Sequence, residues 1–245
     1  MNMATKRIPA LPKKPTTPYI QPKRAKAMTI GVGFNCGDSL VLGSDRQMTR
    51  EGLNKFFEQK LFVDVKPERV MVLVGSGDLS LAKEVWDKLL RYPVEPDIEA
   101  VRTALEATLN DLGRLYAALP LQLLLGVAIK GQVELFSFTN KGIQTNPGFN
   151  VIGIADCSLV RYFGEHLHDI FSSYEDTAVT AYFMLKKAEA HVDGCAGPMD
   201  LVVLTAEPSI KRVDNAWCAK VDELTKERET AFFNQLFSLS LPFPT

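Results

Sequence analysis

The sequence predicts an α+β fold in which two antiparallel sheets stack on each other and a pair of helices covers each outer face, a four-layer αββα sandwich. Two observations lead to it. Segments with the apolar pattern of strands come in runs, and each run of strands is followed by two segments with apolar residues at helical spacing. A parallel sheet would instead alternate single strands with single helices. Residues 29–245 are expected to form this domain.

The first run of strands contains residues 29–34 and 39–44, which a turn over residues 35–38 joins into a hairpin. Further strands are predicted at residues 60–65 and 69–74, and the second of them runs into a turn over residues 75–78. Residues 79–92 and 98–119 have the apolar spacing of two amphipathic helices, and Asp78 is placed to cap the first.

The second half repeats this order. Strands are predicted at residues 121–130, 132–138 and 149–153, and helices at residues 158–171 and 175–191. An apolar strand over residues 199–205 and a short strand over residues 210–213 follow, and a C-terminal helix begins at about residue 215.

Residues 1–28 differ from the rest of the chain. They contain seven of the 28 Lys and Arg residues, none of the 29 acidic residues, and five prolines that repeatedly interrupt a helix. We expect a disordered basic extension, which is interpreted as a solvated tail, the product of a misassigned start codon, or a propeptide. The remaining chain is mildly acidic, so nucleic acid is not an expected partner.

Composition excludes several classes of protein. With 46% hydrophobic and 23% charged residues and a mean hydropathy near zero, the chain has the composition of a soluble globular protein, and no apolar run approaches the roughly 18 residues of a membrane span. Four cysteines without a CxxC pair and three histidines predict neither a disulfide framework nor a zinc site, and no cofactor is expected. Free thiols and the lack of a secretory signal point to the cytoplasm.

Three residues in the first strands suggest chemistry. Thr29 opens the first strand, Asp45 ends its hairpin partner, and Lys60 opens the next strand. Because an antiparallel hairpin brings the start of one strand beside the end of the other, Thr29 and Asp45 should be neighbours. A threonine hydroxyl needs a base to become a nucleophile, and a free α-amine on the same threonine can be that base. A buried lysine beside the aspartate would keep the local potential positive.

Five segments resemble the proteasome β-subunit superfamily, the N-terminal nucleophile hydrolases that include the bacterial HslV peptidase and the Anbu proteins. They are residues 28–34 (MTIGVGF), 40–47 (LVLGSDRQ), 60–62 (KLF), 73–78 (LVGSGD) and 197–204 (GPMDLVVL). With the order of elements, the resemblance covers nearly all of residues 28–213. It implies the αββα fold of these hydrolases, a threonine-type endopeptidase activity, and a homo-oligomeric ring or helical assembly.

The resemblance also implies roles for single residues. Thr29 would be the nucleophile, Asp45 and Lys60 its charged neighbours, the Gly75 N–H an oxyanion donor, and Asp193 the acid that orients the terminal amine. The chain departs from the family at two hydroxyl positions, where Ile154 and Cys195 stand. The plainer interpretations are a strand threonine, a surface ion pair, a tight turn for the glycine, and a solvated loop at Asp193; Arg46 and Gln47 are interpreted as structural.

Two functional hypotheses follow. In the first, the chain cleaves peptides or unfolded proteins once removal of residues 1–28 exposes the α-amine of Thr29, and a partner ATPase is left open. In the second, it is an unprocessed structural or assembly subunit of the same fold, with the extension occupying the cleft or binding a partner. A relative that acts on small amides is a weaker third option.

Overall fold

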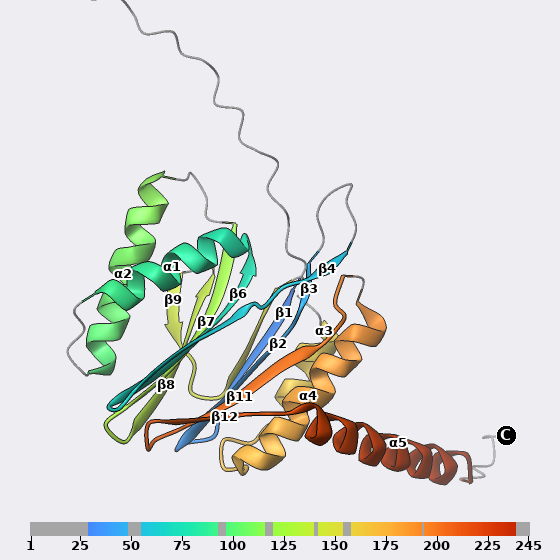
Figure 1. The fold of residues 1–245 in the computed structure, drawn as a ribbon. Coiled ribbons are helices and arrows are strands. Elements are labelled where there is room, and N and C mark those ends of the chain that lie inside the picture. Colours follow the sequence, from blue (N-terminus) through green and yellow to red (C-terminus); the bar gives the residue numbers. More distant parts are fainter. Residues whose placement is uncertain are drawn as a thin grey trace, which may run out of the picture.

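The fold is built on two five-stranded antiparallel sheets. The computed structural model describes residues 29–48, 55–92, 97–115, 120–139, 142–153, 158–192 and 194–238. In the first sheet the order is β10-β1-β2-β11-β12, and Figure 1 shows β1 and β2 at its centre. Its strands are β1 (Ile30–Asn35), β2 (Ser39–Asp45), β10 (Phe149–Gly153), β11 (Met199–Thr205) and β12 (Ser209–Arg212).

The second sheet has the order β5-β6-β7-β8-β9, in which each strand pairs with the next one along the chain. Its strands are β5 (Leu61–Lys66), β6 (Arg69–Gly77), β7 (Leu121–Ile129), β8 (Gln132–Thr139) and β9 (Gly142–Thr145). A separate two-stranded pair, β3 (Gln47–Met48) and β4 (Phe56–Phe57), leads the chain from the first sheet to the second.

Three apolar clusters hold the elements together. One joins the facing sides of the two sheets and includes Leu42, Leu124 and Val202. The second packs α1 (Leu79–Arg91) and α2 (Ile98–Leu115) on the second sheet. The third packs α3 (Ser158–Leu167) and α4 (Tyr174–His191) on the first sheet. The sheets are therefore covered by helices on the sides turned away from each other (Figure 1).

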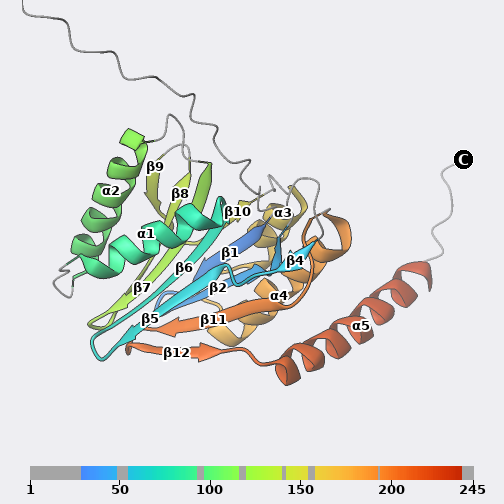
Figure 2. The ribbon, with the colours of Figure 1, turned by 45° about the horizontal axis from the view of Figure 1, so that its top comes forward.

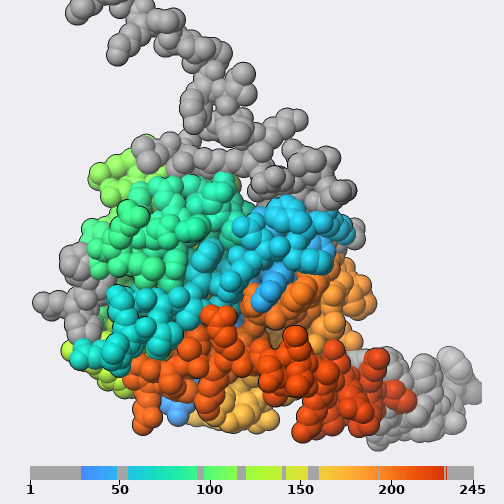
Figure 3. Space-filling model, in the orientation of Figure 1, coloured from blue at the N-terminus to red at the C-terminus, as the bar shows by residue number. Residues whose placement is uncertain are grey.

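The last helix, α5 (Asn215–Ser238), packs its first turns on the body through Val221 and Trp217 and then runs outward (Figure 2). In Figure 3 the blue strands β1 and β2 show only as small patches between neighbouring segments, in keeping with their burial. None of the described helices is long and apolar enough to cross a membrane.

The structure confirms an α+β fold with antiparallel sheets, and most predicted elements are present within a few residues. Three differences have a physical reason. The expected turn over residues 75–78 is strand up to Gly77, because β7 pairs with it. The helix predicted over residues 158–171 ends at Leu167. After it, the Asp169 side chain accepts a hydrogen bond from the Phe171 N–H and stabilises a turn in place of further helix. The short strands β3, β4 and β9 were not predicted. They have no alternating apolar pattern of their own, and only their pairing with a neighbouring strand defines them.

Candidate active site

Thr29 stands at the head of β1 with a fully buried side chain. Gly31, two residues later and therefore on the same face of the strand, faces Val74 and Ile152 of the core between the sheets. The Thr29 side chain consequently lies on the face turned to the second sheet. No residue in the described part of the chain hydrogen-bonds its Oγ1. The hydroxyls of Ser44, Thr108 and Thr177 are also buried without a partner among the described residues, so what distinguishes Thr29 is its place beside the Asp45–Lys60 pair.

The end of β10 holds the backbone of Thr29 in place. Gly153 pairs with Ile30 and has a φ of 116°, a conformation that side chains rarely adopt. A Cβ added to Gly153 would lie 1.7 Å from the Thr29 carbonyl oxygen. Only glycine fits this approach, so Gly153 belongs to the site, and nothing in the sequence pattern distinguished it from other strand glycines.

Asp45, the last residue of β2, receives hydrogen bonds on both carboxylate oxygens. Its Oδ1 accepts from the Ile30 N–H at 3.0 Å and from Lys60 Nζ at 3.0 Å, and its Oδ2 accepts from the Gln47 N–H at 3.2 Å. The Ala196 N–H is a further donor. The hairpin thus places Asp45 beside the peptide bond that joins Thr29 to Ile30, as its register predicts.

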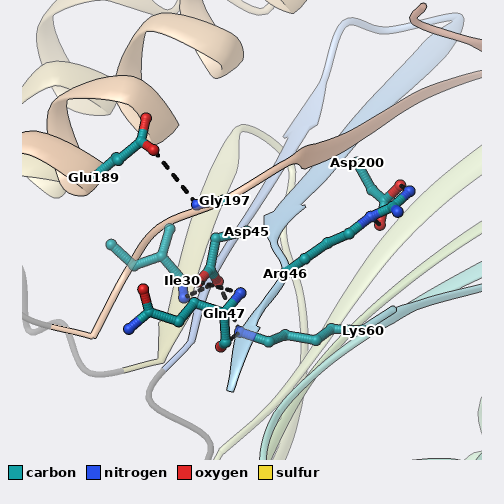
Figure 4. A network of polar contacts seen from close by, with 8 residues as sticks. All are labelled: Ile30, Asp45, Arg46, Gln47, Lys60, Glu189, Gly197 and Asp200. Carbon is teal, nitrogen blue, oxygen red and sulfur yellow. Dashed lines mark hydrogen bonds and ion pairs between the residues drawn. The ribbon is translucent and has the colours of Figure 1, made fainter. Parts of the chain in front are cut away.

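Lys60 lies just before β5, on the side of the second sheet, and is 0% exposed, while Asp45 is 2% exposed. Besides Asp45, its ammonium group donates to the Gln47 carbonyl (Figure 4). Burial lowers the pKa of Lys60 below its usual range and raises the pKa of Asp45 above its usual range, and the attraction between the two groups opposes both shifts. The pair is therefore a buried one and not the surface pair of the plainer interpretation.

Gly75 lies in β6, beside the backbone of Lys60. Its N–H donates to the Lys60 carbonyl at 3.0 Å, so in this conformation the amide is engaged within the sheet. A Cβ at this position would lie 2.6 Å from the Ala82 Cβ, which explains why glycine is needed where α1 packs on the strand. For the Gly75 N–H to serve an oxyanion, it would have to share this hydrogen bond or release it.

The segment before β11 closes the site on its other side. Cys195 is 3% exposed, and its electrostatic effect on Lys60 opposes the lowering of the Lys60 pKa by burial. The Gly197 N–H donates to Glu189 of α4 at 3.4 Å (Figure 4). Asp193 and Ile154 lie outside the described residues, and no cluster of three or more potential metal ligands occurs in the described part of the chain.

Two neighbours of Asp45 have contacts that the sequence interpretation missed. Gln47 is 2% exposed, and its Nε2 has no hydrogen-bond partner among the described residues. Arg46 forms a two-pronged ion pair with Asp200, 154 residues away. The sequence offered one signal for Arg46, its place directly after Asp45, because the pairing of β2 with β11 is what brings Asp200 to this place.

The structure thus places a buried threonine at the head of a central strand and a buried lysine-aspartate pair beside it, on two antiparallel sheets. Solved structures that share this fold include Anbu proteins. No protein-family model matches the sequence, and neither does any curated protein sequence.

Three of these structures give the extent of the likeness. A Gly-1 mutant of Anbu from Hyphomicrobium sp. strain MC1 has a TM-score of 0.72 at 18% identity and covers 89% of this chain and 100% of its own. Anbu from Yersinia bercovieri, described as an ancestral beta-subunit, has a TM-score of 0.73 at 16% identity, covering 88% and 99%. A helical assembly of the Anbu complex from Pseudomonas aeruginosa has a TM-score of 0.70 at 18% identity, covering 88% and 98%. At these identities the likeness establishes the fold.

Proposed function

We propose that this chain is a threonine-type peptidase subunit of a self-assembling, proteasome-like complex in the cytoplasm, with a four-layer αββα fold and Thr29 as nucleophile. One observation supports this function above the others. The Thr29 Oγ1 is buried without a hydrogen-bond partner in the described part of the chain, and the adjoining peptide bond is tied to a buried Asp45–Lys60 pair.

The chemistry starts with removal of residues 1–28, which frees the α-amine of Thr29. This amine takes the proton from Oγ1 as the oxygen attacks the carbonyl carbon of a substrate peptide bond. The proton then passes to the nitrogen of the leaving amine, the C–N bond breaks, and an ester on Thr29 remains. Water hydrolyses the ester and restores the hydroxyl.

The buried charges favour this reaction. Asp45 already receives three backbone N–H donors and the Lys60 ammonium, so its carboxylate is not the base that the hydroxyl needs. The positive charge of Lys60 instead stabilises the developing alkoxide and favours the neutral, basic form of the terminal amine. The substrates are peptides or unfolded proteins, and the subunits assemble with copies of themselves, as the helical assembly of Anbu from Pseudomonas aeruginosa does.

The test combines intact mass with labelling. Protein purified from its native host should begin at Thr29 and should gain the mass of one peptide β-lactone per chain. The Thr29→Ala variant should keep residues 1–28 and remain unlabelled, whereas Thr29→Ser, which keeps the hydroxyl, should retain part of both reactions. A native chain that keeps residues 1–28 and resists labelling would refute the peptidase.

One observation favours a second candidate, an inactive structural subunit of the same fold. The Gly75 N–H is engaged with the Lys60 carbonyl and is not free for an oxyanion. This candidate predicts an intact N-terminus, no labelling, and an assembly that forms equally well with Thr29→Ala. The same mass and labelling experiment therefore separates the two candidates.

A further inference from the structure

The ion pair between Arg46 and Asp200 is the strongest polar contact beside the site that the proposed chemistry does not use. Arg46 Nε donates to Asp200 Oδ2 at 2.8 Å and Nη2 donates to Oδ1 at 2.5 Å, so two parallel hydrogen bonds fix the guanidinium against the carboxylate (Figure 4). The Asp200 side chain is 10% exposed and that of Arg46 is 38% exposed. A pair of this geometry is rigid, because the planar fork admits one orientation.

Arg46 occupies the joint between two differently paired strands. Asp45 before it ends β2, which pairs with β1 and β11, and Gln47 after it begins β3, which pairs with β4. The Arg46 side chain is tied to β11, and its carbonyl accepts from the Glu58 N–H at 2.9 Å. Residue 46 is therefore fixed on two sides, by Asp200 of the first sheet through its side chain and by the segment before Lys60 through its carbonyl.

The two acceptors of the Lys60 ammonium stand on either side of this joint. One is the Asp45 carboxylate, fixed by β2, and the other is the Gln47 carbonyl, fixed by β3. If the joint moves, the two acceptors move relative to each other, and one ammonium group cannot follow both. Their spacing thus depends on whatever holds residue 46.

We propose that Arg46 and Asp200 are positioning residues, which form a clamp that keeps the Asp45 carboxylate and the Gln47 carbonyl at the spacing that Lys60 Nζ requires. The clamp rests on the proposed function, since it matters for activity only if Lys60 acts on Thr29. Releasing it withdraws a hydrogen bond from a buried ammonium, so Lys60 should lose its proton at a lower pH. Among the described residues, the titratable groups that act on Lys60 are Asp45 from β2 and Cys195 from the segment before β11. In the processed chain the freed α-amine of Thr29 is a third, and it is common to the parent and all variants.

The experiment measures how the rate of Thr29 acylation by a peptide β-lactone depends on pH in the processed chain. Asp200→Asn keeps the shape of the side chain and removes its charge. We expect it to slow acylation about tenfold and to move the alkaline limb of the profile down by about one pH unit, the effect of one lost hydrogen bond to a charged group. Arg46→Lys keeps the charge but cannot form both hydrogen bonds to Asp200. Its acylation rate and the position of its alkaline limb should lie between those of Asp200→Asn and the parent.

The matched control is Asp64→Asn, which breaks another partly buried aspartate-arginine pair, Asp64 with Arg69 at 2.7 Å. It should lower the thermal unfolding temperature without moving the pH profile. Equal profiles for Asp200→Asn, Arg46→Lys and the parent would overturn the clamp and leave the peptidase standing. A parent that β-lactone does not label would refute the peptidase, and the role of the clamp would fall with it.

Discussion

Replacing Lys60 by methionine is expected to lower the free energy of unfolding by about 3 to 5 kcal/mol, the usual cost of removing one partner from a buried ion pair. The prediction follows from burial. Lys60 is 0% exposed, Asp45 is 2% exposed, and Lys60 Nζ lies 3.0 Å from Asp45 Oδ1. Methionine has a similar length and is apolar, so the change removes the charge with little change in packing.

The expected loss of stability comes from two acceptors, the Gln47 carbonyl and the Asp45 carboxylate, because both lose the Lys60 ammonium as a donor. The Gln47 carbonyl loses the ammonium, and a buried acceptor without a partner costs about 1 to 3 kcal/mol. The Asp45 carboxylate loses its counter-charge but keeps the N–H groups of Ile30, Gln47 and Ala196. Those remaining donors place the expected loss nearer the lower end of the range.

A double-mutant cycle provides the assay. Lys60→Met, Asp45→Asn and the double variant are unfolded in guanidinium chloride, in a Thr29→Ala background so that all chains keep the same N-terminus. The double variant removes both charges, so it should be more stable than either single variant, with a coupling energy of at least about 2 kcal/mol. A Lys83→Met control breaks an exposed pair with Asp87 and should cost less than about 1 kcal/mol. Single variants that cost no more than this control would refute the argument.

Three further changes test other parts of the fold. Gly153→Ala should lower the free energy of unfolding by more than about 1 kcal/mol and slow β-lactone labelling, because its Cβ would collide with the Thr29 carbonyl. Asp78→Ala should cost about 1 kcal/mol in chemical denaturation, because the side chain caps the first turn of α1. His168 donates to the Asn35 carbonyl, and burial lowers its pKa, so the folded chain binds this proton less readily than the unfolded chain does. The free energy of unfolding should therefore fall as the pH falls below 6.5, and His168→Gln should remove this part of the pH dependence.

Each of these changes has a matched control. Gly148→Ala places a Cβ in open space and should leave labelling unchanged. Asp78→Asn keeps a side-chain acceptor at the helix cap and should cost little. His166→Gln changes the exposed histidine of α3, and it should leave the loss of stability below pH 6.5 in place. A control that behaved like its partner variant would contradict the contact on which that prediction depends.

Much of the secondary structure was predictable because it is encoded locally. The strands β1 and β2 and the helices α1 and α4 have apolar residues at the spacing of their own periodicity, and their bounds agree with the prediction to within about two residues. Where pattern was weak, prediction failed. The two-residue strands β3 and β4 have no period of their own, and Gly75 to Gly77 form strand only because β7 lies beside them.

In the candidate site, too, the residues that local sequence could predict differ from those that depend on contacts between distant strands. The sequence by itself determined that Thr29 opens a strand and that Asp45 ends the hairpin partner of that strand, because hairpin geometry follows from two adjacent strands and a short turn. It also supplied Lys60, through the resemblance of its segment to the proteasome β-subunit superfamily. These residues lie within 32 positions of one another in the chain.

Only the tertiary structure decided what surrounds them. Burial of Lys60 depends on the contact between two sheets, and the tie from Arg46 to Asp200 joins residues 154 positions apart. Gly153 is required because β10 approaches Thr29 from more than a hundred residues away, and the Gly75 N–H is engaged because β5 lies beside β6. Such contacts have no local pattern, since the pairing of distant strands creates them.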